Sequence, residues 1–476
     1  MAPMATAEDS SDRLVDAVAH LPFVTADSDR LAPLLTDWRG TKTGTARLLA
    51  EPRNSEEVQM LVRAAAASAT PLVPQGGNTG LVGGSVPEAD GRAVLVSLRR
   101  MDRVRDLDSV SQTVVVEAGL ILQQLHEAAA DAGLQFPLSL GAKGSATVGG
   151  LISTNAGGTQ VLRYGTMRAQ VLGLEAVLPD GTLVDQLTPL RKDNTGYDIK
   201  QLFIGAEGTL GIVTAASLRL VPAPQVTATA IAALDTPDAA LELLSRLQAA
   251  TGGIVDSFEL IPRIAVDLVT RHVPGTRDPL TQPYPWYVLA ELTSSEPGRD
   301  LASLLEGALA DAIEAGTVAD AVVAQTGQQR DEFWQLRETI AVAEREDGPA
   351  LKHDITVPVA DMPRFLRDVG GEIEARWPGT SIFAFGHLGD GNIHFNVRSE
   401  EPPPRAELVA KKAEIADFVY ERIADFGGSI SAEHGIGTLK AAALARLGDP
   451  GKLAAMRAIK SALDPQNIMN PGKVLS

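Results

Sequence analysis

The chain has 476 residues, 45% apolar and 21% charged, so it is long enough for two or three domains and too apolar to be disordered. Acidic residues outnumber basic ones by 60 to 42, and the net charge of −18 argues against nucleic acid or an anionic membrane as a partner. The absence of cysteine excludes disulfides, thiolate zinc sites, iron–sulfur clusters and a catalytic thiol. No apolar run approaches a membrane span, and the acidic start lacks signal-peptide and transit-peptide features, so we expect a cytoplasmic protein without an integral membrane segment.

Residues 1–50 are predicted to form a helical lead-in and a connecting stretch. Asn54 and Glu57 then have the spacing of a capping box, and the apolar residues that follow recur at helical period. Asp180-Gly181 between two apolar runs predicts a hairpin, and Pro222-Ala-Pro224 predicts a boundary. The expected strands of this part are 70–74, 93–98, 110–117, 171–178, 182–184 and 212–221.

Residues 225–425 alternate strands with longer helices, which predicts an α+β domain whose antiparallel sheet is covered by helices. Thr236 and Pro237 supply the cap and first residue of a helix. The other expected helices are 299–315, 328–346, 361–376 and 405–425, and the expected strands are 226–234, 287–292, 318–324, 355–359, 382–385 and 393–397. With a glycine-rich turn, a helix and a tail at the end, the predicted division is 1–224, 225–425 and 426–476.

Three glycine-rich loops dominate the first part of the chain. Five of the ten residues 75–84 are glycine and none is acidic, which lets backbone N–H groups approach an anion closely. Residues 137–158 contain no acidic residue either, and a third glycine-rich piece spans 205–213. The first loop lacks the Rossmann spacing, and no P-loop pattern occurs in the chain. A tight surface turn is the alternative for the first loop alone, but the three together favour a dinucleotide held outside a Rossmann frame.

The glycine loops contain three motifs, which are Gln75-Gly-Gly-Asn-Thr-Gly80, Thr147-Val-Gly-Gly150 with Asn155-Ala-Gly-Gly158, and Glu207-Gly-Thr-Leu-Gly211. In order and spacing these motifs resemble the FAD-binding domain of the vanillyl-alcohol-oxidase and p-cresol-methylhydroxylase class of flavoproteins. The resemblance implies a two-subdomain domain in which 75–80 hold the FAD pyrophosphate and 137–158 run along the flavin and ribityl chain. Some members bond the flavin to a histidine in the first loop. Asn78 takes that place here, so non-covalent FAD is implied. The implied FAD contacts are Pro74, Gln75, Gly76, Gly77, Asn78, Thr79, Gly80, Leu138, Gly141, Ser145, Thr147, Gly149, Gly150, Asn155, Gly157, Glu207, Gly211, Ile212 and Asn470.

Three of the seven histidines fall within residues 387–434. His387 and His394 lie on either side of an Asp-Gly turn at the ends of two expected strands, so a hairpin can direct both rings to one point. Glu433 adds a carboxylate, and two imidazoles with a carboxylate are the ligands of an open, catalytic zinc-type site. The alternative is that each histidine makes only local hydrogen bonds, and Asp390 in the turn is expected to cap backbone N–H groups.

The motifs at 387–396, 432–437 and 470–475 resemble the D-2-hydroxyacid dehydrogenase branch of this class. That branch includes the dehydrogenases of D-2-hydroxyglutarate and D-lactate and the glycolate oxidase flavin subunit. The resemblance implies a cap domain for the substrate and a C-terminal segment that returns to the flavin. It also implies that His387, His394 and Glu433 bind a divalent metal, expected to be zinc, and that His434 is the catalytic base. Arg337, Lys352 and Asn396 match the residues that bind substrate.

Together, the implied FAD site, metal site and catalytic base predict oxidation of a D-2-hydroxy acid by hydride transfer to the flavin, with the metal lowering the pKa of the substrate hydroxyl. Two cations, Arg337 and Lys352, favour a dicarboxylate, because a monocarboxylate would leave one of them unpaired. Ala341 argues the other way, since the D-2-hydroxyglutarate enzymes carry a threonine at this place. D-2-Hydroxyglutarate is therefore the first expected substrate, with D-lactate and D-malate as alternatives.

Two other functions stay open on the sequence. One is a metal-dependent hydrolase or lyase that uses the histidine cluster without redox chemistry. The other is a non-catalytic subunit that binds FAD, as in glycolate oxidase complexes. For the dehydrogenase, the resemblance implies electron transfer to electron-transfer flavoprotein or a quinone-linked acceptor. For the quaternary structure, we consider a homodimer.

Overall fold

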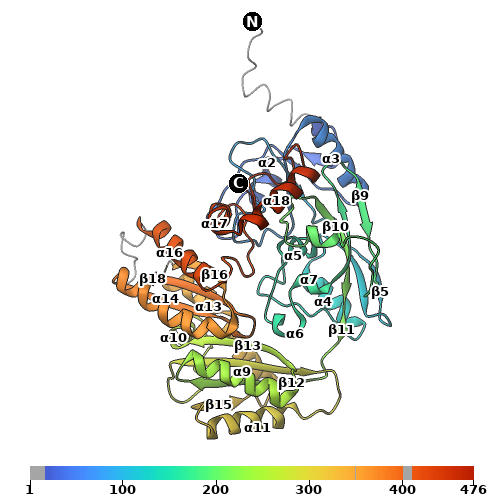
Figure 1. Ribbon diagram of the computed structural model, residues 1–476. Coiled ribbons are helices and arrows are strands. Elements are labelled where there is room, and N and C mark those ends of the chain that lie inside the picture. Colours follow the sequence, from blue (N-terminus) through green and yellow to red (C-terminus); the bar gives the residue numbers. More distant parts are fainter. Residues whose placement is uncertain (1–16, 349, 400–409, 476) are drawn as a thin grey trace. The chain divides into compact units, whose positions relative to one another are not determined.

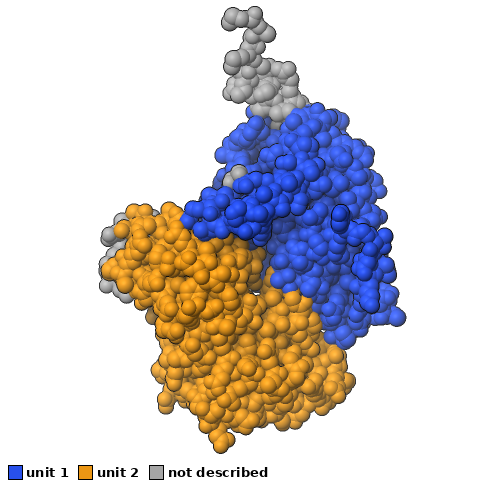
Figure 2. Space-filling view, in the orientation of Figure 1, with its two compact units in different colours: residues 1–156, 166–222, 434–476 blue, residues 157–165, 223–433 orange. Residues whose placement is uncertain are grey.

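The computed structural model describes residues 17–348, 350–399 and 410–475, which divide into two compact units (Figures 1 and 2). Unit 1 contains the described parts of 1–156, 166–222 and 434–476, and unit 2 contains those of 157–165 and 223–433. This division differs from the predicted one in two places. Residues 157–165 belong with unit 2, and unit 2 continues to Glu433 instead of ending at 425. Parts of the predicted elements 1–50 and 405–425 lie outside the described residues.

Unit 1 is built on two main sheets. The first has the order β1-β2-β4-β3, in which β2, β4 and β3 run parallel and β1 pairs antiparallel to β2. The second is antiparallel with the order β5-β6-β10-β8-β9, and β8 and β9 form the hairpin that Asp180-Gly181 predicts. The strands are β1 (Val24–Thr25), β2 (Leu48–Ala50), β3 (Leu72–Gln75), β4 (Val94–Ser97), β5 (Val104–Asp108), β6 (Thr113–Glu117), β8 (Val171–Val177), β9 (Leu183–Gln186) and β10 (Ile212–Arg219), with the short pair β7 (Leu134–Gln135) and β11 (Val221–Pro222).

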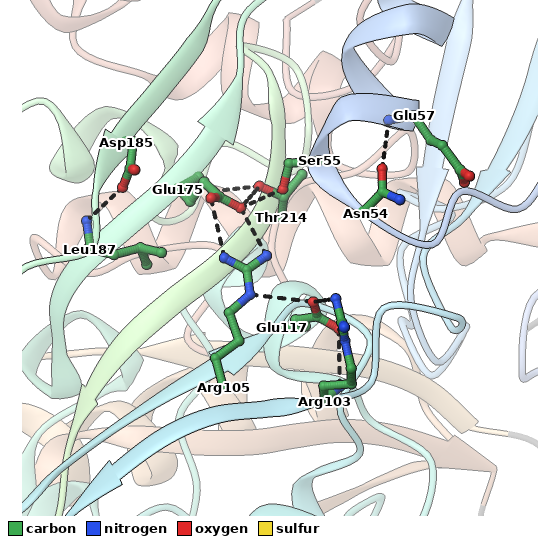
Figure 3. Close-up of polar contacts among 10 residues, drawn as sticks. All are labelled: Asn54, Ser55, Glu57, Arg103, Arg105, Glu117, Glu175, Asp185, Leu187 and Thr214. Carbon is green, nitrogen blue, oxygen red and sulfur yellow. Dashed lines mark hydrogen bonds and ion pairs between the residues drawn. The ribbon is translucent and has the colours of Figure 1, made fainter.

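Helix α3 (Ser55–Ser68) begins at the predicted cap, because the Asn54 side chain accepts a hydrogen bond from the Glu57 amide at 2.9 Å. Its first residue joins the helix to the second sheet. Ser55 Oγ donates to Glu175 on β8 at 2.5 Å, and Thr214 on β10 donates to the same carboxylate at 2.7 Å (Figure 3). Arg105 on β5 bonds to Glu175 at 3.2 Å, so one buried carboxylate of β8 connects this strand to α3, β5 and β10.

The remaining helices of unit 1 lie around these sheets. The C-terminal part forms two helices where the sequence predicted one, because Gly448 and Asp449 end the first and cap the second. Within the described residues, no helix is both long and apolar enough to cross a membrane. The helices are α2 (Ser28–Leu31), α4 (Leu122–Asp131), α5 (Val148–Thr154), α7 (Met167–Gln170), α8 (Lys200–Phe203), α17 (Ala441–Leu447) and α18 (Pro450–Leu463), with the 3₁₀ turn η1 (Ala32–Leu34).

Unit 2 is an antiparallel seven-stranded sheet with the order β15-β12-β14-β13-β17-β18-β16 (Figure 1). It confirms the predicted helix-covered antiparallel sheet. One face packs on α9, α11, α14 and α16, and the other on α10, α12 and α13. The strands are β12 (Val226–Leu234), β13 (Val255–Pro262), β14 (Trp286–Ser294), β15 (Asp320–Val323), β16 (Ala350–Thr356), β17 (Thr380–His387) and β18 (Asn392–Ser399). The helices are α6 (Val161–Tyr164), α9 (Pro237–Thr251), α10 (Arg263–His272), α11 (Leu301–Glu314), α12 (Gly327–Glu338), α13 (Ile340–Asp347), α14 (Met362–Arg376) and α16 (Lys412–Asp425), with the turns η2 (Val359–Asp361) and η3 (Leu388–Asp390).

Three predictions for unit 2 need correction. Strand β13 and helix α10 were not predicted, although they follow one another directly from Val255 to His272. The single helix expected at 328–346 is two helices that meet at Thr339, which caps the C-terminus of α12. Strand β16 begins at Ala350 and ends at Thr356, earlier than the predicted 355–359, so Lys352 lies inside a strand.

Candidate active site

The first glycine loop follows β3 in unit 1 and packs directly on residues 145–147. A Cβ on Gly77 would overlap the carbonyl oxygen of Ser145, and one on Gly76 would overlap Thr147 Oγ1. Only glycine permits this approach. Arg99 holds the loop from its other side, donating to the Gly76 and Gly77 carbonyls at 3.2 and 3.0 Å.

A cavity of about 190 Å³ is lined by three residues that contact this loop, Arg99, Ser145 and Thr147, and by others that include Asp102 and Gln124. Thr147 Oγ1 and Asn470 Oδ1 are buried side-chain oxygens without a hydrogen-bond partner among the described residues. Buried polar atoms normally have partners, and a polar ligand that bonds to these two oxygens would supply them. The cradle and these oxygens fit the phosphates and hydroxyls of FAD.

Asn78 has a left-handed backbone with φ of 56° and bonds on both ends of its amide. Its Nδ2 donates to the Thr36 carbonyl at 2.9 Å, and its Oδ1 accepts from Ser85 at 2.9 Å. The side chain therefore shapes the loop. An amide also lacks the nucleophilic nitrogen with which a histidine would bond a flavin.

Glu207 and Asn470 attach the C-terminal segment to the rest of unit 1. The buried Glu207 carboxylate accepts hydrogen bonds from the amides of Ile436 and Gly437 at 2.7 and 2.8 Å. Asn470 Nδ2 donates to the carbonyls of Glu207 and Gly84 at 2.7 and 2.9 Å. Burial raises the pKa of Glu207 in spite of the two amide bonds. The Glu207 carboxylate therefore bonds to other residues of unit 1, and it lies next to the loops that are predicted to bind the cofactor.

The other predicted FAD contacts are spread over strands, loops and one helix of unit 1. Gly149 and Gly150 lie in α5, Asn155 caps its C-terminus with φ of 50°, and Gly211 and Ile212 open β10. Pro74 and Gln75 end β3, whereas Thr79, Gly80, Leu138 and Gly141 lie in loops. Gly157 belongs to unit 2, where a Cβ would approach Glu433 Oε1 at 3.3 Å.

The predicted histidine hairpin is formed by β17 and β18 of unit 2. Phe385 pairs with His394 across the two strands, and the His387 and His394 ring centroids lie 6.0 Å apart. Because side chains two residues apart on a strand share a face, His387 lies on the same face as Phe385 and therefore His394. Gly391 has φ of 84° in the connecting turn, and Asp390 there accepts from the Asn392 amide at 2.9 Å, the capping role predicted for it.

Glu433 completes a group of possible metal ligands with these two histidines. One ligand atom from each of the three lies within 4.8 Å of the others, and His387 Nε2 is 3.6 Å from Glu433 Oε1. The Glu433 backbone amide donates to Asp354 at 3.0 Å, which fixes this segment to β16. Burial, reinforced by Asp354 and Asp390, raises the pKa of Glu433 to about 7. Two imidazoles and a carboxylate whose negative charge is disfavoured in the protein alone fit a divalent cation.

The fully buried Glu259 was missed in the sequence, and it connects this group to Arg337. Its carboxylate lies 2.6 Å from His387 Nδ1 and accepts from Arg337 Nε at 2.7 Å. Burial opposes ionisation of Glu259, but the charges of His387 and Arg337 lower its pKa to about 2. Burial likewise lowers the pKa of His387, but Glu259 outweighs it and raises that pKa to about 9. In the sequence, the feature that indicates a special role for Glu259 is its position as the single carboxylate within the otherwise apolar segment Phe258–Ile261.

The predicted substrate residues Lys352 and Asn396 are cross-strand neighbours on β16 and β18. Both bond to the fully buried Glu344 of α13, Lys352 Nζ at 2.8 Å and Asn396 Nδ2 at 2.9 and 3.1 Å. Both predicted substrate cations therefore already have carboxylate partners, because Arg337 bonds to Glu259. A monocarboxylate substrate would therefore leave neither cation unpaired, contrary to what the sequence predicts. Ala341 lies exposed on α13.

His434, the predicted base, follows Glu433 directly and begins the C-terminal part of unit 1. The predicted residues thus form two groups. The glycine cradle, Glu207, Asn470 and His434 belong to unit 1, whereas His387, His394, Glu433, Arg337, Lys352 and Asn396 belong to unit 2.

The glycine cradle of unit 1 fits FAD, and the comparison with known families identifies the class of protein as an FAD-dependent oxidoreductase of α+β fold. Residues 46–186 match the family model described as FAD binding domain, and residues 223–474 match the model described as FAD linked oxidases, C-terminal domain. The chain belongs to the FAD-linked oxidase family. This membership confirms FAD as the cofactor and an oxidoreductase as the class of enzyme, in place of a hydrolase or lyase.

Curated relatives extend over nearly the whole chain. The mitochondrial D-2-hydroxyglutarate dehydrogenase of Bos taurus is 40% identical over 454 residues, which cover 95% of this chain and 81% of the relative. The D-2-hydroxyglutarate dehydrogenase of Xanthomonas citri pv. viticola is 37% identical over 461 residues, covering 97% of this chain and 96% of the relative. Among solved structures, p-cresol methylhydroxylase has a TM-score of 0.75 at 16% identity and covers 100% of this chain and 98% of its own. This likeness confirms the predicted fold class.

Proposed function

We propose that the protein oxidises D-2-hydroxyglutarate to 2-oxoglutarate with non-covalently bound FAD and a divalent metal, which we expect to be zinc. The observation that carries the proposal is the shared sheet face of unit 2. Two imidazoles and Glu433 gather there beside two cationic side chains, Arg337 and Lys352. Relatives at about 40% identity bear the corresponding name, which supports this substrate.

The metal would be held by His387, His394 and Glu433. When bound, it would lower the pKa of the substrate hydroxyl, and FAD would supply the acceptor for the hydride from the substrate Cα. His434 accepts the hydroxyl proton, which a neutral imidazole can do near neutral pH.

Arg337 and Lys352 bind the substrate carboxylates, and Asn396 supplies a further hydrogen bond. A guanidinium carries five N–H donors and Glu259 takes the one on Nε, so Arg337 can serve a substrate carboxylate while it stays attached to β13. The Lys352 side chain, which is 30% exposed, is held against Glu344, and this ion pair weakens the positive field of Lys352 at the site.

One observation favours a second candidate substrate. Because Glu344 already neutralises Lys352, binding a monocarboxylate such as D-lactate leaves no cation without a partner. D-Malate is the shorter dicarboxylate alternative. The substrate range is therefore a question of relative kcat/KM.

Electrons are proposed to leave to another protein, electron-transfer flavoprotein or a quinone-linked acceptor. A cytoplasmic location and a homodimer stay predictions. An oxidase instead of a dehydrogenase would be recognised by rapid reoxidation in air with stoichiometric peroxide.

Anaerobic titration of the purified yellow protein tests the proposal. D-2-Hydroxyglutarate should bleach the flavin bands, whereas the L-enantiomer should leave them unchanged. Denaturation should release the flavin, because the proposed FAD is not bonded to Asn78. A protein that binds FAD and zinc but is not reduced by any D-2-hydroxy acid would contradict the proposed function.

A further inference from the structure

We propose that Glu259 is a positioning residue that couples the metal site to the substrate-binding arginine. The inference rests on the proposed function. One carboxylate fixes the orientation of the metal ligand His387 and that of Arg337 at the same time. Neither side chain can then turn without breaking its bond to this shared carboxylate.

The sheet brings Glu259 to this position. Glu259 on β13 is the direct cross-strand neighbour of His387 on β17, and Leu289 of β14 flanks it on the other side. Its side chain is 1% exposed, between a sheet and the helices α10, α12 and α13. An ionised carboxylate at such a depth requires strong partners. Its two oxygens have one each, at 2.6 and 2.7 Å.

On the histidine side, the contact selects one ring nitrogen for the metal. Glu259 Oε1 lies at Nδ1 of His387, so Nδ1 carries the proton and donates it. Nε2 then points to Glu433, 3.6 Å from Oε1, which is the direction the proposed metal requires. A carboxylate behind a ligating histidine fixes the tautomer and raises the basicity of the ligand.

On the arginine side, the contact fixes the guanidinium plane. Arg337 Nε donates to Glu259 Oε2, and the guanidinium carbon lies 5.0 Å from the centre of the Phe385 ring. Phe385 in turn contacts His394, with ring centroids 4.9 Å apart. The arginine is therefore held against the same strand that carries the first metal ligand.

The same sheet offers a matched control in Glu291 of β14. This glutamate is also buried and also attaches α12, since it accepts from Arg330 at 2.7 and 2.8 Å and from Trp334 Nε1 at 2.8 Å. Among the described residues it bonds to Thr229, Arg330 and Trp334, none of which is a proposed metal ligand. Glu259→Gln and Glu291→Gln both weaken the attachment of α12, but only the first changes the environment of His387.

The test measures zinc affinity of the FAD-loaded protein by competition with a chromophoric chelator, without substrate. We expect Glu259→Gln to lower zinc affinity about 10- to 100-fold and Glu291→Gln to stay within about threefold of the wild type. At saturating zinc, Glu259→Gln should also raise KM for D-2-hydroxyglutarate about tenfold or more, because the Arg337 plane is released. The flavin spectrum should not change in either variant.

A second variant at this position, Glu259→Asp, keeps the inference testable if Glu259→Gln fails to fold. Glu259→Asp keeps the charge but withdraws the carboxylate by one methylene, so zinc affinity should lie between that of the wild type and that of the Gln variant. If the folded variants bind zinc as the wild type does, the inference is wrong and the proposed function stands. If the wild type itself binds no zinc or oxidises no D-2-hydroxy acid, the proposed function fails.

Discussion

Buried glutamates occur in both units, but their charges are balanced in different ways. In unit 1, Glu117 bonds to Arg103 and Arg105, and Glu175 bonds to Arg105, so two carboxylates face two guanidinium groups (Figure 3). In unit 2, the charge of Glu259 is matched, but burial opposes ionisation of the Glu433 carboxylate, and Asp354 and Asp390 oppose the favourable charges of His387 and Arg337 on it.

The pKa values express this difference. Burial raises the pKa of Glu175, yet the bonds from Arg105, Ser55 and Thr214 outweigh burial, and the pKa is lowered overall. The pKa of Glu433 is instead raised to about 7. A balanced network such as that of Glu175 stabilises the fold. A group of acids and imidazoles without that balance would be stabilised by the proposed cation, so we propose a stabilising role for the first region and a chemical role for the second.

The largest expected effect comes from removing a proposed metal ligand in unit 2. His394→Ala should lower kcat/KM by roughly 10³-fold or more, because a metal supplies several kcal/mol of catalysis. FAD content and the melting temperature should change little, since the fold of unit 1 does not depend on this residue. Chelator-treated wild type is the control and should behave alike. Full activity of a rigorously metal-free wild type would exclude the metal from the mechanism.

The corresponding change in unit 1 should act on stability. Arg105→Met leaves Glu175 and Glu117 with fewer cationic partners and should cost about 3 kcal/mol in the free energy of unfolding. The double variant Arg105→Met/Glu175→Gln should recover part of that loss, because it removes the buried charge. Urea unfolding followed by circular dichroism measures both. Equal stability of the single variant and wild type would show that the network is energetically neutral.

The sequence predicted those structural features that depend on a local pattern of residues. The Asn54 cap, the hairpin of His387 and His394 and most strands were correct, because spacing and turn residues determine them. Glu259 and Glu344 were not predicted, although each bonds to two candidate site residues. Their roles depend on which strands become neighbours in the sheet and which helix covers them, and β13 itself carries no turn signal or strict alternation.

A smaller effect should distinguish two roles for Lys352. Lys352→Met should lower kcat/KM for D-2-hydroxyglutarate about tenfold and change that for D-lactate less, if Lys352 binds the second carboxylate. The double variant Lys352→Met/Glu344→Gln is the control, because it also removes the charge that Lys352 neutralises. Recovery of activity in the double variant would show that Lys352 serves only to compensate Glu344.

The smallest effect is a pH dependence of stability that arises in unit 1. The hydrogen bonds and charge of the arginines lower the pKa of Glu117 and of Glu175 against the effect of burial. A group with a lowered pKa in the folded state stabilises the protein above its ordinary pKa, and this contribution is lost as the pH falls through the folded-state value. The free energy of unfolding should therefore fall below about pH 4.5 as the unfolded chain takes up protons first.

Glu175→Gln removes one of these groups, so its stability curve should lie below that of the wild type at pH 7 and approach it as the pH falls. Asp131→Asn, at an exposed position of α4, is the control and should run parallel to the wild type. Urea unfolding at intervals between pH 7 and pH 3.5 measures the three curves. A constant difference between Glu175→Gln and the wild type over this range would mean that Glu175 contributes through its shape and not through its charge. The balanced network would then differ from the proposed metal-binding group of unit 2 in geometry alone.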